Sequence, residues 1–213
     1  MHLPLGKSKE ELKRVLHELA AKNNITDSGI KITLTGGYSE DGYSLQKPNL
    51  VITQRAQSFN NNTLPQELRL ITYEHQRQLP DVKTIDYLMA IWLRPHIIES
   101  AADDVLYCKN GKITECPRSN IFIVTKDNRI VTPGNQILKG VTRKYIIEIA
   151  RKLFTVEEQD VLIEDALNAK EVFITSTTKG ILPVIEINRK KIGNGIFGKV
   201  SMFLKEQLLR ITV

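Results

Sequence analysis

The chain has 213 residues, of which 41% are hydrophobic, and it carries a formal net charge of +6. This length allows one large domain or two modest ones with a buried core. Lysine and arginine are scattered, and Arg189 to Lys191 is the only run of three basic residues, so the dense basic stripe of a nucleic-acid-binding protein is lacking. No apolar run reaches transmembrane length, so we expect no membrane association.

The two cysteines, Cys108 and Cys116, match no metal-site spacing and are too few for a disulfide framework. Because the N-terminus also lacks the apolar core of a signal peptide, we expect reduced thiols in a cytoplasmic protein. Four histidines match no metal-ligand pattern, and we assign them structural or surface roles: His2, His17, His75 and His96.

The N-terminal part predicts one helix and two strands. Ser8 and Glu11 form a capping box, after which five apolar residues fall on one helix face, namely Leu12, Val15, Leu16, Leu19 and Ala20. Residues 30–34 alternate as in a half-buried strand, and residues 50–52 form a second strand. The polar run QSFNNNT at 57–63 is the best linker candidate. We therefore predict a small domain over 1–56, a linker over 57–65 and a larger domain over 66–213.

The larger part mixes strands and helices. A strand is predicted over 68–73, followed by a helix carrying Leu88 and Trp92 that Pro95 should kink or split. Residues 105–124 read as a hairpin with its turn at Asn110 and Gly111, which places Glu115 on the second strand. The remaining predicted elements are helices over 141–153, 164–169 and 198–211, a strand over 172–175 and a hairpin around Asn188-Arg189.

Glu115 lies in the stretch GKITECPRSNIF, between Thr114 and Cys116 and just before an apolar strand. A carboxylate in such a place loses much of its hydration on folding, so it requires a positive or donating partner. Either the chain or a ligand must supply this partner.

Two segments could bind an anion. The predicted helix start at Gly140 to Arg143 offers free backbone N–H groups, a threonine hydroxyl and a guanidinium, which suit a phosphate. The turn Ser176-Thr177-Thr178 offers hydroxyls and further N–H groups at a strand end. Each signal is weak alone, because both are also ordinary helix and turn sequences.

Lys83 is one of 30 basic residues, and a solvated side chain is the simplest interpretation of any one of them. Asp86 and Tyr87 follow at a spacing that, at a helix start, would place their side chains on the same side as the amine. A lysine that forms a Schiff base must be partly desolvated, and a nearby phenol suits a cofactor oxygen. A phosphate site, such a lysine and a carboxylate for a pyridinium nitrogen are the contacts that pyridoxal phosphate requires.

At this point the sequence resembles the class IV (fold type IV) pyridoxal-phosphate aminotransferases, which include branched-chain and D-amino-acid aminotransferases and aminodeoxychorismate lyase. The matching segments are KTIDYL at Lys83, GKITECPRSNIF at Glu115, TPGNQILKGVTR ending at Arg143, and EVFITSTTKGILPVIEI at 171–187. Their order and spacing agree from about Leu68 to the C-terminus. The resemblance implies an α/β (α+β) fold with a small α/β domain, truncated relative to the family, and a larger α/β pseudo-barrel domain.

The resemblance also implies roles for individual residues toward pyridoxal 5'-phosphate. Lys83 would form the Schiff base and later move the proton, Tyr87 would hydrogen-bond the 3′ oxygen, and Glu115 would pair with the protonated ring nitrogen. The backbone of Val141 and Thr142, together with the Thr177 hydroxyl, would hold the phosphate. Thr178 would lie near the substrate carboxylate. Asn120 would support the strand after Glu115.

The reaction implied is transfer of an amino group from an amino acid to a 2-oxo acid such as 2-oxoglutarate, by a cytoplasmic homodimer. A branched-chain L-amino acid is the expected donor. D-amino-acid aminotransferases carry an arginine and a histidine just after the second small-domain strand, where this chain has Thr35-Gly36-Gly37-Tyr38, which argues against D-amino acids.

Two alternatives stay open. One is a pyridoxal-phosphate lyase such as aminodeoxychorismate lyase, since the lyases share Lys83, Glu115 and the Thr-Glu-Cys run at 114–116. The other is a non-catalytic remnant, because family members carry a segment before the position of Met1 with an arginine that contacts the phosphate.

Overall fold

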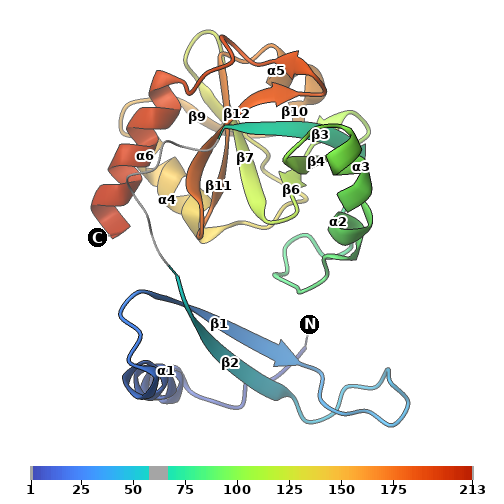
Figure 1. Ribbon diagram of the computed structural model, residues 1–213, viewed down its shortest axis with the longest axis vertical. Helices are drawn as coiled ribbons and strands as arrows, with labels where there is room; N and C mark the ends of the chain where they lie inside the picture. The colour runs from blue at the N-terminus through green and yellow to red at the C-terminus, as the bar shows by residue number, and fades with distance from the viewer. Residues whose placement is uncertain (1, 58–66, 213) are drawn as a thin grey trace. The chain divides into compact units, whose positions relative to one another are not determined.

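The computed structural model describes residues 2–57 and 67–212, and the chain divides into two compact units, Met1–Thr63 and Leu64–Val213. Figure 1 shows the ribbon coloured along the chain. Most of the linker predicted over 57–65 lies outside the described residues. Each unit is described by itself.

The smaller unit consists of α1 (Lys9–Asn23), β1 (Ser28–Thr35) and β2 (Asn49–Ala56). The predicted capping box is confirmed, since Ser8 Oγ accepts from Glu11 N and the Glu11 carboxylate accepts from Ser8 N. β1 and β2 are antiparallel, with Ile32 opposite Ile52. Ile30 and Ile32 are 42% and 48% exposed, so this face is less buried than the alternation predicted. One helix and two strands offer too little surface to enclose it.

The larger unit contains five helices and eleven strands within its described residues. The strands are β3 (Leu68–Glu74), β4 (Asp104–Lys109), β5 (Lys112–Ile113), β6 (Glu115–Cys116), β7 (Ser119–Val124), β8 (Ile130–Thr132), β9 (Val156–Glu158), β10 (Val161–Leu162), β11 (Glu171–Ser176), β12 (Gly180–Ile187) and β13 (Lys190–Lys191). The helices are α2 (Leu88–Trp92), α3 (Arg94–Glu99), α4 (Val141–Ala150), α5 (Ile163–Leu167) and α6 (Lys199–Thr212).

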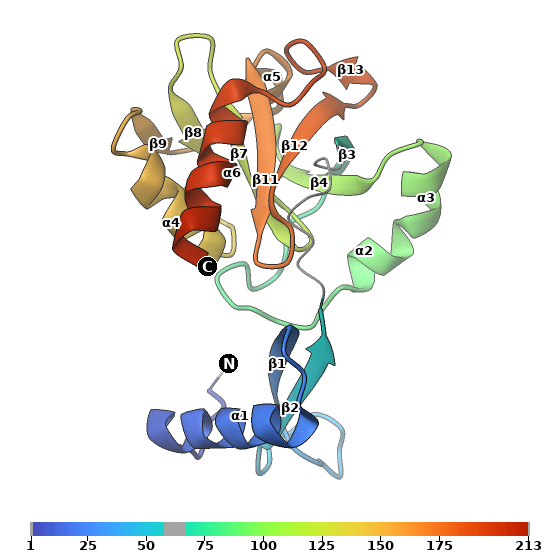
Figure 2. The same ribbon diagram turned by 60° about the vertical axis from the view of Figure 1, so that its left-hand side comes forward.

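These strands form one curled sheet in the order β10-β5-β4-β3-β12-β11-β7-β8-β9, with β6 paired to β7 and β13 to β12. β3 lies between β4 and β12 and is parallel to both, while most other pairs are antiparallel (Figure 2). The two ends of the order, β9 and β10, are consecutive in the chain, so the sheet curls into a partial barrel.

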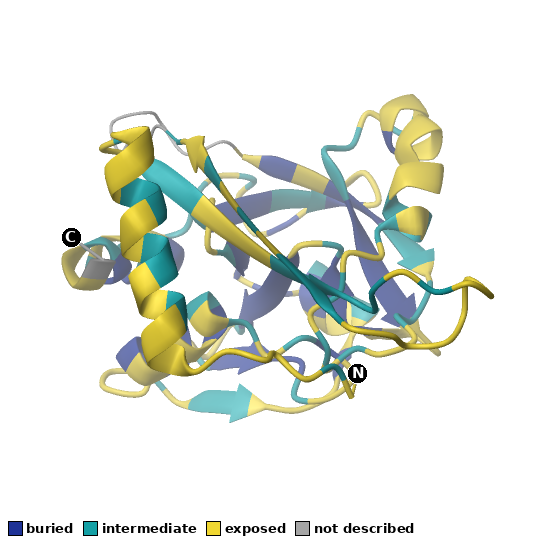
Figure 3. Cartoon of the chain, turned by 90° about the horizontal axis from the view of Figure 1, so that it is seen from below, coloured by how far each residue is buried: buried dark blue, intermediate teal, exposed yellow. Residues whose placement is uncertain are grey.

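Three apolar clusters fill this unit, and Figure 3 shows the buried residues concentrated in its strands. The largest contains Ile121, Ile174 and Val184 from neighbouring strands. A second joins Phe122 and Phe173 to α4 and α6, which lie on one side of the sheet, while a third packs α2 and α3 against β3 and β4 (Figure 1). The alternation of side chains along each strand explains why β7 and β11 contribute to two clusters.

The structure corrects three local predictions. The helix predicted over 141–153 ends at Ala150, and Leu153, the last residue of the predicted range, is 68% exposed. Residues 83–87 are a loop before α2, so the helical spacing assumed for Lys83, Asp86 and Tyr87 does not apply. Glu115 lies on β6, which breaks from β5 at Thr114 and forms a second tight hairpin with β7.

The predicted turns and the split at Pro95 are confirmed. Asn110 and Gly111 both have positive φ, as a two-residue hairpin turn between β4 and β5 requires. Asn188 and Arg189 adopt the same region between β12 and β13. α2 ends at Trp92 and α3 begins at Arg94, with Pro95 in its first turn. Among the described residues, no helix combines the length and apolar character needed to cross a membrane.

Candidate active site

Glu115 is buried, with 4% of its surface exposed, at the start of the β6–β7 hairpin. Its two carboxylate oxygens have different partners. Oε1 accepts from Arg77 Nη1 at 2.9 Å, and Oε2 accepts from the Leu138 backbone N–H at 3.0 Å. Both bonds come from segments distant in the chain, so the carboxylate has a fixed orientation. A carboxylate has about four lone-pair sites, so each oxygen can accept one more donor.

Arg77 is a site residue that the sequence did not reveal. It lies in the loop after β3, and its guanidinium also donates to the backbone carbonyls of Pro80 at 3.1 Å and Val82 at 2.8 Å. Arg77 thus joins Glu115 to the backbone directly before Lys83. No local signal marks this arginine, because it lies 38 positions before Glu115 and no spacing rule connects the two.

Burial raises the pKa of Glu115, while the hydrogen bonds from Arg77 and Leu138 and the charges of Arg77 and Lys83 act in the opposite direction. The rise reflects the cost of moving a charge out of water. The positive charge of Lys83 acts in the same direction as Arg77 and favours the ionised carboxylate, which lowers the pKa of Glu115. The Glu115 carboxylate, which can accept a proton, is therefore influenced by two positively charged side chains, Arg77 and Lys83.

A row of polar side chains crosses the sheet beside Glu115. Glu115 lies opposite Asn120 on β7, and Asn120 lies opposite Thr175 on β11. Asn120 Nδ2 donates to Leu138 O at 2.7 Å, so it holds the loop whose N–H binds Glu115. Asn120 was predicted to support the strand after Glu115, whereas its side chain holds this loop. Thr175 Oγ1 is buried and has no hydrogen-bond partner among the described residues.

The first turn of α4 lies next to this row. A Cβ added to Gly140 would come within 2.4 Å of Asn120 Oδ1, so the absence of a side chain lets the helix start approach β7. Gly140 caps α4 without a side-chain hydrogen bond, and the structure records no acceptor for the N–H groups of Val141 and Thr142 in the described chain. Such free amides at a helix start suit an anion.

Arg143 has a different role from the one its position suggested. Its Nη2 donates to Pro133 O at 2.8 Å and to Glu158 Oε2 at 3.0 Å, so the guanidinium joins α4 to β9. The sequence grouped this guanidinium with the anion-binding helix start. The structure instead uses it to hold the loop before α4, and only the backbone and Thr142 remain from that group.

The other predicted residues lie on exposed segments of the same unit. Lys83 is exposed on the loop before α2, and Tyr87 is half-buried directly before that helix. Thr177 and Thr178 are exposed in the turn between β11 and β12, one and two residues past Ser176. The structure records no hydrogen bond between these four side chains and the rest of the described chain.

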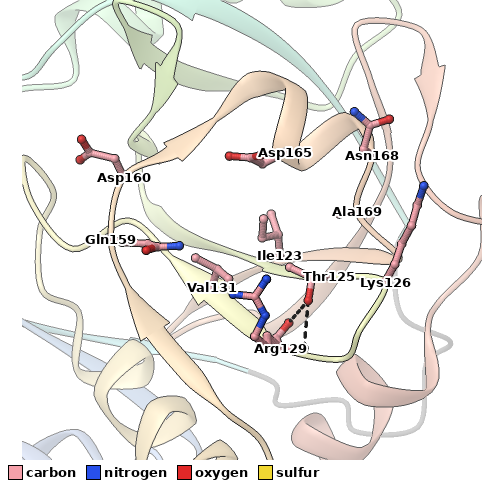
Figure 4. A pocket seen from close by; sticks show the side chains of 10 residues that line it. All are labelled: Ile123, Thr125, Lys126, Arg129, Val131, Gln159, Asp160, Asp165, Asn168 and Ala169. Atoms are coloured by element: carbon pink, nitrogen blue, oxygen red, sulfur yellow. Dashed lines mark hydrogen bonds between the residues drawn. The ribbon is translucent and has the colours of Figure 1, made fainter.

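Two cavities lie apart from the α4 start. One, of about 370 Å³, borders Arg77 and Tyr87 and is lined by His75, Trp92 and Tyr107. The other, of about 290 Å³, lies at the far end of β7 from Asn120, where Figure 4 shows Ile123 below α5 and the Thr125 hydroxyl directed at Arg129. Two of its polar groups bind within the protein: Thr125 bonds the Arg129 backbone, and Arg129 pairs with Asp127 and Glu157.

The chain matches a known protein family. Residues 1–187 match the family described as amino-transferase class IV. D-alanine aminotransferase from Staphylococcus haemolyticus is 31% identical over 214 residues, which cover 97% of this chain and 76% of that protein. D-alanine aminotransferase from Listeria monocytogenes serotype 4b is 32% identical over 212 residues, covering 93% and 72%. The chain therefore belongs to the class IV aminotransferases, which are pyridoxal-phosphate-dependent enzymes.

Solved structures confirm the predicted fold. A putative 4-amino-4-deoxychorismate lyase from Legionella pneumophila has a TM-score of 0.87 at 25% identity, covering 98% of this chain and 79% of that one. The branched-chain amino acid aminotransferase from Thermobaculum terrenum, in its pyridoxal-phosphate form, has a TM-score of 0.89 at 21% identity, covering 98% and 72%. The predicted fold type and cofactor class are thus correct.

The residues present fit this cofactor. Glu115 retains room for one further donor on each carboxylate oxygen, as a ring N–H would require. The α4 start supplies unpaired amides for a phosphate, and the Thr175 hydroxyl lacks a partner beside them. This donor set is matched to an aromatic cation at one end and an anion at the other.

Proposed function

We propose that this enzyme transfers an amino group from an amino acid to a 2-oxo acid, using Lys83 and Glu115 as its central residues. The observation that carries the proposal is the buried Glu115 carboxylate, fixed by Arg77 and the Leu138 amide with lone pairs still free. Bound pyridoxal phosphate supplies an electron-withdrawing ring that accepts the electrons released when the substrate Cα–H bond breaks.

Glu115, Lys83 and Tyr87 have separate roles in this reaction. The Glu115 carboxylate holds the proton of the ring nitrogen, which keeps the ring electron-withdrawing. Lys83 would hold the cofactor through its amine and, when the substrate amine takes that place, would move the proton from the substrate Cα to the cofactor carbon that bears the nitrogen. Tyr87 would donate to the ring oxygen. Lys83 is exposed in this chain, and bound cofactor would cover it.

The phosphate is assigned to the backbone N–H groups of Val141 and Thr142 and to the Thr177 hydroxyl. The close approach of Gly140 to Asn120 supports this, because it fixes the helix start beside the Glu115 row. Thr178, the next residue of the β11–β12 turn, is assigned to the substrate carboxylate.

For the donor, we propose a branched-chain L-amino acid. The residues directly after β1, Gly36 and Gly37, support this choice because they provide no cation for a carboxylate. The identity to D-alanine aminotransferases favours D-alanine as the competing donor. A panel of L-leucine, L-valine, L-isoleucine and D-alanine with 2-oxoglutarate separates the two, and turnover of D-alanine alone would overturn our choice.

A lyase is the second candidate reaction, favoured by the likeness to the Legionella protein, a putative 4-amino-4-deoxychorismate lyase. Pyruvate release from aminodeoxychorismate without a 2-oxo acid would establish it. Turnover of any kind by the purified chain would exclude a non-catalytic remnant.

We also propose a homodimer. Apolar side chains project into solvent around α2 and α3, and a second copy would cover them: Ile85, Leu88, Ile91, Trp92 and Ile98. Sedimentation should give twice the mass of 24.2 kDa, and Leu88→Glu should shift the protein to monomer.

The buried free thiols of Cys108 and Cys116 support a reducing compartment such as the cytoplasm.

The primary test is cofactor binding through Lys83. Purified protein mixed with pyridoxal phosphate should develop a visible absorbance band that Lys83→Ala lacks. Lys139→Ala provides a control lysine in the loop before α4. If the wild-type protein gives no band, or if Lys83→Ala keeps it, Lys83 is not the cofactor lysine.

A further inference from the structure

We propose that Arg77 is a positioning residue that sets both the charge of Glu115 and the backbone of the loop carrying Lys83. This inference rests on the proposed function, since it concerns how the two central residues are coordinated.

The Arg77 guanidinium makes three hydrogen bonds, one to Glu115 and two to the backbone just before Lys83. Nη1 donates to the Glu115 carboxylate and to Pro80 O, and Nη2 donates to Val82 O. A planar guanidinium makes such contacts in a fixed fork, so moving one partner disturbs the others. Val82 is directly bonded to Lys83, which links the carboxylate to the lysine backbone through one side chain.

The position of Arg77 is enclosed on most sides. Its side chain is 16% exposed and that of Glu115 is 5% exposed, so little water screens the pair. The positive charges of Arg77 and Lys83 both favour the ionised Glu115 carboxylate. Lys83 would become uncharged or delocalised when it binds an aldehyde, which leaves Arg77 as the permanent cation beside the carboxylate.

The Arg77 cation influences which atom holds the proton between Glu115 and the ring nitrogen. A carboxylate and a ring nitrogen that share one proton can hold it on either atom, and the more basic atom keeps it. Arg77 stabilises the ionised carboxylate and so favours the proton on the ring nitrogen. Without Arg77, burial favours the neutral carboxylic acid, and the proton moves to Glu115. The total number of protons is unchanged, and only their position differs.

The experiment measures that position directly. The holoenzyme is prepared with pyridoxal phosphate labelled with ¹⁵N in its ring, and the ¹⁵N chemical shift reports whether the nitrogen is protonated. In the wild-type enzyme we expect the protonated shift. In Arg77→Gln we expect a change toward the unprotonated shift, with kcat reduced about tenfold or more.

Two further variants separate charge from geometry. Arg77→Lys retains the cation and should keep the protonated ¹⁵N shift, but a point-charge amine cannot reproduce the fork, so kcat should stay below wild type. Arg129→Gln removes a guanidinium that pairs with Asp127 and Glu157 at the far end of β7, and it should change neither quantity.

A double-mutant cycle tests whether Arg77 acts through Glu115. In a Glu115→Gln background, Arg77→Gln should lower kcat by a smaller factor than in wild type. Equal factors in both backgrounds, or an unchanged ¹⁵N shift in Arg77→Gln, would overturn the proposal. A wild-type protein that binds no cofactor would instead contradict the proposed function, so the two failures are distinguishable.

Discussion

The Glu115 carboxylate combines two requirements that usually conflict, burial and charge. Burial raises its pKa, and only the hydrogen bonds and cations around it oppose that rise. A neutral amide of the same shape keeps the packing and loses the charge.

We therefore expect Glu115→Gln to fold and bind cofactor while kcat falls about a hundredfold or more, the size of loss seen when one charge-stabilising group is removed. Glu157→Gln, which removes a half-buried carboxylate paired with Arg129, is the matched control. Circular dichroism and the visible band report folding and cofactor binding, and activity equal to wild type would contradict the role of Glu115.

Tyr107 provides a second residue whose ionisation is tied to the fold. Burial first, and then the nearby charge of Asp104, raises its pKa from 10.0 to about 12. The folded protein therefore favours the neutral phenol. Its contribution to stability is complete below pH 10 and is lost as the pH rises through about 12.

Between these two pH values we expect the unfolding free energy of the wild type to fall by about 3 kcal/mol more than that of Tyr107→Phe. Chemical denaturation of both proteins at several alkaline pH values measures this difference. Identical pH dependence in the two proteins would show that the phenol is not shielded in the fold.

At the scale of elements, the start of α6 depends on a carboxylate from another strand. Glu171, the first residue of β11, accepts from the N–H groups of Val200 and Ser201 and from the Ser201 hydroxyl. Gly198 leaves room for this side chain, since an added Cβ would lie within 2.2 Å of it. The helix thus receives its N-terminal acceptor from the sheet on which it packs.

Glu171→Ala should lower the unfolding free energy by about 3 kcal/mol, because two buried N–H groups lose a charged acceptor. Ser201→Ala removes only the hydroxyl and should cost about 1 kcal/mol. Denaturant titrations of the two variants give the comparison. Equal losses would mean that the carboxylate contributes no more than the hydroxyl does.

Local sequence rules predicted the elements that local forces determine. The capping box at Ser8, the Asn110-Gly111 turn and the break at Pro95 each depend on residues a few positions apart. Periodicity failed at the end of α4, where Leu153 continues the apolar pattern but lies past the last helical turn. β9 and β10 are three and two residues long, too short to show any period.

For the site, the sequence identified the carboxylate but not its protein partner. The burial expected for Glu115 is confirmed, whereas Arg77 contacts it only because β3 and the β6–β7 hairpin belong to one sheet. For Arg143 the sequence suggested a role that the structure does not show. Its position at the helix start suggested an anion contact, but its guanidinium binds Glu158. Contacts between distant segments require the sheet order, which no local pattern gives.

At the scale of the whole molecule, the two units differ in how much they bury. None of residues 2–57 is buried, whereas the larger unit contains all three apolar clusters. All residues assigned to the cofactor, from Lys83 to Thr178, lie in the larger unit.

A fragment of residues 67–213 should therefore unfold cooperatively and give the visible cofactor band, while a fragment of residues 1–57 should show no cooperative transition. Thermal melts followed by circular dichroism, with and without pyridoxal phosphate, test both statements. A larger fragment that folds but binds no cofactor would place part of the cofactor site in the smaller unit.

The position of β3 in the sheet also determines when its strand pairs can form during protein synthesis. β3 is the first strand of the larger unit to leave the ribosome, yet one of its two parallel neighbours, β12, is among the last. Its Thr72 is bonded to Asn188, 116 residues later. Until that residue emerges, one edge of β3 has no native strand to pair with. The nascent chain thus carries an open strand edge from the synthesis of β3 until that of β12, and an unpaired edge is a template for aggregation.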